Sequence, residues 1–153
     1  MKYTVLLLSL IFWLFPFKDF EIQWVENLDG DFSFSRKHSL KSEAWCYEYA
    51  GATEITAKRL HKDTIECYTM TNAATHCSLR FYIVNNVIRN PRIELNSIAD
   101  GKHLYQCNEG NIIIDKKAMQ KDILKARFDM KFDHPENPEK VMFWKGKIYA
   151  KIK

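Results

Sequence analysis

The fold class is decided by the stretch ILKARFDMKFD, residues 123–133. Apolar residues occupy every second position from Leu124 to Phe132, and Lys, Arg or Asp stands between them. A strand with this period of two buries one face and exposes the other. A helix would scatter the same apolar residues around its circumference. The stretch therefore predicts a half-buried β-strand.

The residues that follow predict a partner for this strand. Residues 146–153 alternate small or apolar residues with Lys or Tyr, and a short apolar run, Val141–Trp144, precedes them. The intervening loop, residues 133–139, contains two prolines and several polar residues, which is typical of a turn. We expect an antiparallel hairpin with a β-bulge at Gly146.

Shorter strand patterns fill the rest of the chain, with polar turns every eight to twelve residues. They include turns at residues 61–63 and 108–110, and the one helical candidate covers Lys116–Lys121. The absence of long amphipathic helices argues against a parallel sheet. We predict an all-β fold, an antiparallel β-sandwich or small barrel of about eight short strands. The eight expected strands cover residues 43–50, 55–60, 64–70, 77–84, 103–107, 111–115, 123–133 and 141–153, and residues 93–98 are a further candidate.

The length and the N-terminus indicate one domain behind a short leader. A chain of 153 residues fits a single domain. Lys2 precedes a nearly apolar run, Val5–Phe17, which is the layout of a signal peptide and is too short for a membrane-spanning helix. We assign residues 1–20 to a signal peptide or short hydrophobic anchor, and residues 21–153 to a single antiparallel β domain. The run ends without an A-x-A-like cleavage motif, and a buried N-terminal strand or helix is the alternative.

The four cysteines also bear on whether the protein is exported to an oxidising compartment. In a hairpin turning around Asn72, Cys67 would lie opposite Cys77 on the apolar side, which leaves Cys46 to pair with Cys107. The alternative is four buried thiols in a reducing compartment. The cysteine spacings do not match a zinc site, so we expect no metal.

Excess positive charge is confined to the C-terminal quarter. Residues 115–153 hold 11 Lys or Arg against 6 Asp or Glu, a net of +5, whereas residues 1–114 hold 12 against 13. Lys145, Lys147, Tyr149 and Lys151 share one strand face and form a candidate surface for an acidic partner, a membrane surface or nucleic acid. The alternative is that these lysines protect an exposed sheet edge from aggregation.

No catalytic motif is present, and no catalytic or cofactor-binding residue is assigned. The chain lacks G-x-S-x-G, H-E-x-x-H, P-loop and G-x-G-x-x-G patterns. Glu48, on an expected strand, and His76, in a polar loop, could in principle supply acid and base groups, but no pattern brings them together. Trp45, Tyr47 and Tyr49 form an aromatic stripe that we expect to pack into the core.

These observations favour an exported small binding protein that works without catalysis. Within that class, size and export suggest an inhibitor or immunity-type protein of a bacterial envelope, in the periplasm or secreted, with another protein as its partner. The N-terminal segment offers association with a membrane, and no nucleic-acid-binding motif is present. Two alternatives stay open, a lipocalin-like carrier of a small ligand and a hydrolase with dispersed active-site residues.

Overall fold

The structure, a computed structural model, describes residues 18–30, 41–46, 51–69, 77–97, 101–134 and 136–153. The predicted signal or anchor segment lies almost entirely outside these residues. The described part is nearly all antiparallel β-structure, which confirms the predicted fold class. Its elements are β1 (Phe20–Glu21), β2 (Gln23–Val25), β3 (Glu43–Cys46), β4 (Gly51–Ala52), β5 (Ile55–His61), β6 (Thr64–Thr69), β7 (Cys77–Val84), β8 (Val87–Ser97), β9 (Gly101–Asp115), α1 (Lys116–Met119), β10 (Ile123–Asp133) and β11 (Val141–Lys151).

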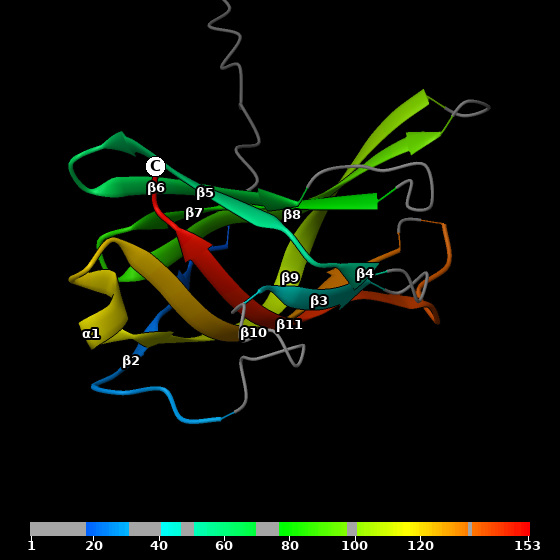
Figure 1. Cartoon of the computed structure of the whole chain (residues 1–153). Coiled ribbons are helices and arrows are strands. Elements are labelled where there is room, and N and C mark those ends of the chain that lie inside the picture. The colour runs from blue at the N-terminus through cyan, green and yellow to red at the C-terminus, as the bar shows by residue number, and fades with distance from the viewer. Residues whose placement is uncertain (1–17, 31–40, 47–50, 70–76, 98–100, 135) are drawn as a thin grey trace, which may run out of the picture.

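The strands form one curled sheet, a half-barrel, with the order β4-β3-β11-β10-β9-β8-β7-β6-β5. Figure 1 shows β5 to β8 in one layer and β3, β10 and β11 in the other. The short strands β1 and β2 pair with β8 and β9, respectively, and the β2–β9 pairing is parallel. The two layers belong to one continuous sheet, so the fold has features of both a β-sandwich and a β-barrel.

The long strand β9 joins the two layers. Its first part pairs with β8 through residues 101–106, and its second part pairs with β10 through residues 107–114. The predicted turn at residues 108–110 is wrong, because the chain runs straight through it as a single strand. The polar residues there mark a β-bulge instead, where Lys131 faces Glu109 and Phe132 faces Cys107.

The predicted C-terminal hairpin is confirmed. β10 covers the eleven residues expected, and it pairs with β11 from Ile123–Lys151 to Asp133–Val141 without a register shift. Gly146 forms no bulge against β10, but it has a φ of +146°. A Cβ atom there would lie 2.1 Å from the Glu43 carbonyl oxygen. The glycine therefore allows β3 to approach β11 closely.

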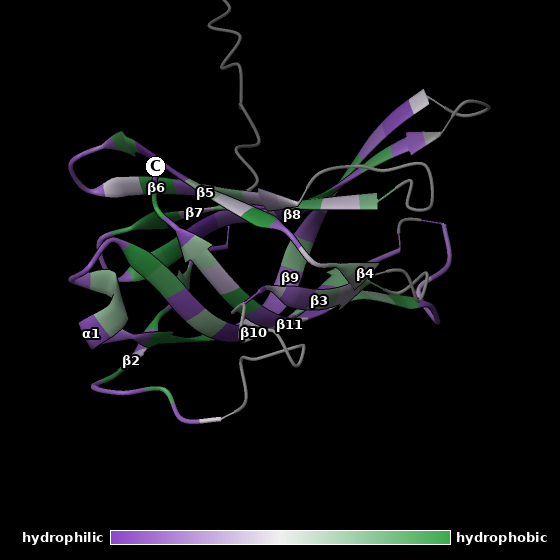
Figure 2. Ribbon diagram, in the orientation of Figure 1, coloured by the Kyte–Doolittle hydropathy of each residue, from purple (hydrophilic) through white to green (hydrophobic). Residues whose placement is uncertain are grey.

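The core lies between the layers and follows the predicted alternation (Figure 2). Every second residue of β10, from Leu124 to Phe132, is buried, and β7 contributes Leu79, Phe81 and Ile83. Trp144 is the largest fully buried side chain, and its Nε1 donates to the Sγ of Cys77 at 2.9 Å. Side chains thus fill the space between the layers.

β3 faces the opposite way from the prediction. Trp45 is 46% exposed, whereas Ala44 and Cys46 are buried. Cys46 lies across from Trp144 in the β3–β11 pairing, so the large indole of β11 already occupies the core and only small β3 side chains fit beside it. Tyr47 and Tyr49 lie outside the described residues.

The predicted disulfides do not form, and all four cysteines are buried thiols. Cys67 lies opposite Phe81, not Cys77, because β6 and β7 pair four residues out of the expected register. Cys77 instead faces Leu95 on β8. The β6–β7 pairing is centred two positions further along the chain than a turn around Asn72 requires.

The start of the described chain is tied to the barrel by Asp115, which ends β9 and caps α1. Its carboxylate accepts hydrogen bonds from the backbone N–H groups of Leu28 at 3.0 Å and Ala118 at 2.8 Å. α1 is the predicted helix, shortened to one turn. No helix in the described part of the chain is long and apolar enough to cross a membrane.

Candidate functional site

The predicted surface residues come together on the outward face of β11. Lys145 and Lys151 are exposed, and Lys147 and Tyr149 are half-buried. β11 is not an edge strand where these lysines lie, because β10 pairs along its length and β3 pairs with residues 144–147. Protection of a free edge therefore does not explain the lysines at positions 145 and 147.

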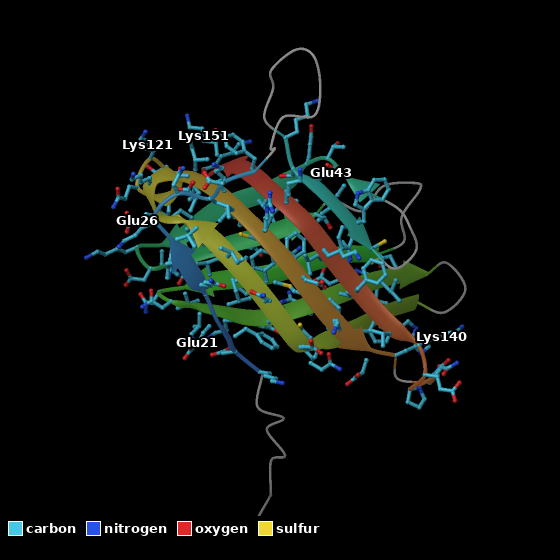
Figure 3. The ribbon with its side chains drawn as sticks, turned by 90° about the horizontal axis from the view of Figure 1, so that it is seen from below. Glu21, Glu26, Glu43, Lys121, Lys140 and Lys151 are labelled. Carbon is cyan, nitrogen blue, oxygen red and sulfur yellow. The ribbon has the colours of Figure 1, made fainter. Side chains whose placement is uncertain are left out.

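Neighbouring strands extend this surface. Trp45 of β3 lies beside Lys145, while Arg127 and Lys125 of β10 lie beside Lys147 and Tyr149. Figure 3 shows β9, β10 and β11 side by side on this face, with Lys151 at one end of β11 and Lys140 just beyond the other. We call this surface the β11 face and define it as Trp45, Lys125, Arg127, Phe143, Lys145, Lys147, Tyr149 and Lys151.

The β11 face combines cationic and aromatic groups. The Lys145 ammonium lies 5.1 Å from the centroid of the Phe143 ring, and the Trp45 indole is 46% exposed beside it. Glu43 and Asp129 are the acidic residues directly across from Lys147 and Lys145. Lys125 also lies 3.4 Å from the Asp115 carboxylate. Five cations against these three carboxylates leave the face positive. Such a surface attracts acidic partners and offers aromatic anchors.

A groove of about 330 Å³ continues this surface toward β5. Lys41, Lys151 and Lys153 line it, and Glu54 is its acidic residue. The buried Ser42 hydroxyl fixes one wall, because it accepts a hydrogen bond from Tyr149 N–H at 3.0 Å and donates to the Tyr149 carbonyl at 3.4 Å. The groove presents ammonium and hydroxyl groups, which suit a carboxylate or phosphate of a partner.

The outward face of the other layer carries a different arrangement, a ladder of alternating charges. Arg80 lies between Glu66 at 2.5 Å and Glu94 at 3.0 Å, and Arg92 pairs with Glu94 at 2.9 Å. Burial lowers the pKa of Arg80, but the two carboxylates outweigh this and raise it. Because its charges are mutually neutralised, we interpret this ladder as cross-strand stabilisation.

Three observations bear on catalysis. Glu48 and His76, the candidate acid–base pair, lie outside the described residues. No group of three or more His, Cys, Asp or Glu suited to a metal ion occurs in the described ranges. Burial raises the pKa of the Cys107 thiol to about 12 and that of Cys67 even further, so neither thiol is a ready nucleophile.

Sequence reasoning identified the lysines and Tyr149 of the β11 face but missed Trp45 and Phe143. The aromatic alternation predicts Trp45 in the core, whereas its exposure depends on the position of Trp144 in the β3–β11 pairing. Comparison with known proteins finds no match: no family model, no curated protein and no solved structure is significantly similar to the chain.

Proposed function

We propose that the chain is an exported, non-catalytic binding protein that captures an acidic partner protein through the β11 face. The observation that carries the proposal is the grouping of cations with the exposed Trp45 on a face of three paired strands. Rigid strands hold these side chains in place, which lowers the entropy lost on binding. Aromatic residues and Arg are also the residues that dominate binding energy in protein interfaces.

An inhibitor or immunity-type protein of a bacterial envelope is the class that fits best. Such proteins need a rigid, complementary surface and no reaction centre. Electrostatic attraction would speed association with an acidic target. The charged and apolar pattern of residues 1–17 supports export. The cysteines add no support, because they form no disulfides that would favour an oxidising compartment.

The carrier alternative has less support. A lipocalin-like carrier needs a cavity inside the barrel, whereas Trp144, Phe81 and Phe132 are fully buried between the layers here. The hydrolase alternative needs titratable groups that converge in a cleft, and the ladder on β6, β7 and β8 consists of paired charges instead.

Charge reversal on the β11 face tests the proposal. Immobilised domain would be used to capture proteins from an envelope extract of the producing organism, and a captured protein would then be purified and its Kd measured by calorimetry. We expect K145E/K147E to weaken binding at least tenfold and to flatten its salt dependence, because close opposite charges contribute about 1.5 kcal/mol or more. We expect W45A to weaken binding as well.

The matched control is K58E/K102E, which makes the same change in net charge at exposed positions on β5 and β9. This control should keep the wild-type Kd. Equal binding by K145E/K147E and K58E/K102E would overturn the β11 face as the interface. Fusing residues 1–20 to a periplasm-dependent reporter enzyme tests export separately, and an inactive fusion would count against it.

A further inference from the structure

A histidine at the end of β10 holds the connection to β11. The Nδ1 atom of His134 accepts the backbone N–H groups of Glu136 at 3.3 Å and Asn137 at 3.2 Å. A ring nitrogen that accepts these hydrogen bonds has a lone pair and carries no proton. The ring must therefore carry its single proton on Nε2, and the connection closes only around an uncharged His134.

Strand β9 contacts the same ring. The centroid of the Tyr105 ring lies 6.3 Å from that of His134, and the two ring planes differ by 22°. His103 stacks on Tyr105 in turn, with its centroid at 6.3 Å. Because the face of an aromatic ring attracts a cation, a charged His134 can stay against Tyr105. Protonation therefore acts on the two hydrogen bonds to the connection and not on the stack.

We propose that His134 is a pH-sensitive catch, which holds the β10–β11 connection closed when its Nδ1 is unprotonated and releases it when Nδ1 gains a proton. The added N–H points at two N–H donors, so both hydrogen bonds break. The titratable and charged groups that flank the ring, along the connection or in the stack on β9, are Asp133, Glu136, Glu139, Lys140, His103 and Tyr105. In the part of the chain that the structure describes, no carboxylate pairs with His134, so none replaces the lost bonds.

The direction of the pH effect follows from the proton count. The closed connection binds one proton fewer than the open one, so it is favoured at high pH and lost as the pH falls. Histidine is the side chain that ordinarily changes its charge between about pH 5 and pH 8, whereas carboxyl groups ordinarily titrate near pH 4. The loss of two neutral hydrogen bonds shifts the equilibrium between closed and open connection about tenfold or more.

NMR of the ¹⁵N-labelled full chain, titrated from pH 8 to pH 5.5, tests the proposal. Long-range ¹H–¹⁵N spectra of the His134 ring show which nitrogen carries the proton. We expect the proton on Nε2 at pH 8, and we expect the Glu136 and Asn137 amide protons to move upfield with the same midpoint as the ring. A proton on Nδ1 at pH 8, a ring that stays neutral throughout, or amide signals that stay in place while the ring titrates would overturn the proposal.

The variant H134N separates the acceptor from the titration. An Asn side-chain oxygen can accept the same N–H groups, as in an Asx turn, but does not titrate. We expect the Glu136 and Asn137 signals of H134N to stay fixed across the range. H134F removes the acceptor, so both amides should exchange with solvent about tenfold faster than in wild type at pH 8.

The matched control is H103N, which removes the other histidine of the stack and should titrate like wild type. Amide signals that still move in H134N, or that stop moving in H103N, would contradict the assignment of the catch to His134. The wild-type titration decides the question even if a variant unfolds.

Discussion

At the scale of single residues, buried polar groups are held mainly by backbone partners. Asp115 is the clearest case, because its side chain is only 3% exposed. Burial alone would raise its pKa, but hydrogen bonds from Leu28 N–H and Ala118 N–H, with Lys125 at 3.4 Å, lower it below the ordinary value. One carboxylate thus caps α1 and fixes the segment after β2.

Replacing Asp115 with Ala should lower the free energy of unfolding by about 2–3 kcal/mol, since a helix cap and a second charge-assisted hydrogen bond are lost. D115N keeps an acceptor oxygen but no charge, so it should lose less. Urea unfolding at pH 7 measures both. Equal losses for D115A and D115N would show that the charge, and not the acceptor, holds these N–H groups.

The pH dependence of stability follows from the sign of the same pKa shift. The stabilisation by Asp115 is complete above the unfolded carboxyl pKa of about 3.9 and is lost as the pH falls through the lower folded pKa. Between pH 5 and pH 2, wild type should therefore lose more stability than D115N. Urea unfolding across this range checks the prediction, and parallel curves would contradict it.

The cysteines permit a prediction about redox state. All four thiols are buried, and burial raises the pKa of Cys107 to about 12. We expect reductant to leave the melting temperature unchanged, and iodoacetamide to modify the thiols only after denaturation. Mass spectrometry of the alkylated chain gives the count. A native mass below that of the reduced chain, together with a lower melting temperature in reductant, would show that disulfides form after all.

At the scale of elements, the sequence predicts the bounds of a strand correctly where apolar and polar residues alternate along its whole length. β10 and β7 have the bounds that their sequences predict, because each has one apolar face against the core. The sequence predicts two strands in place of β9, because the polar residues at its bulge resemble those of a turn. The prediction turns the wrong face of β3 toward the core, because the orientation of β3 depends on Trp144, which is distant in sequence.

For the candidate site too, some features follow from the local sequence pattern and others depend on contacts between distant strands. The lysines of the β11 face follow from the alternation within β11, so the sequence predicts that they share a face. Their contact with Trp45 depends on the β3–β11 pairing, which no local pattern reveals. A pocket lined by Trp24, Ile83 and Met119 cannot be predicted for the same reason, because β2, β7 and α1 meet there only in the folded sheet.

The charge ladder on β6, β7 and β8 makes a testable contribution between elements. R80M keeps the apolar stem of Arg80 and removes its bonds to Glu66 and Glu94. Because the groups are partly buried, we expect a loss of about 1–2 kcal/mol in urea unfolding. R59M removes the exposed pair with Asp122 and should cost less than about 1 kcal/mol. Equal costs for the two variants would show that the ladder stabilises no more than a surface ion pair.

At the scale of the whole molecule, the last residues hold the sheet in its curled form. Ile152 bridges to Ala57 of β5, Arg59 N–H donates to the Lys153 carbonyl at 2.7 Å, and Lys153 N–H donates to the Ala57 carbonyl at 3.0 Å. The C-terminal end lies beside β5 in Figure 1. The end of β11, which is third in the sheet order, thus meets β5, the last strand, at a seam that forms one wall of the groove next to the β11 face.

Shortening Ile152, which is buried at this seam, should open it without unfolding the rest. For I152A we expect a loss of about 2–4 kcal/mol, typical of a buried Ile→Ala change. Hydrogen exchange should show lost protection at the Arg59 and Lys153 amides while the β10 amides stay protected, because β10 keeps both its neighbours. V141A, at the exposed opposite end of β11, is the control and should change neither measurement. If every strand of I152A lost protection equally, the seam would unfold together with the core. The contacts at the seam would then not form a separate, local closure of the sheet.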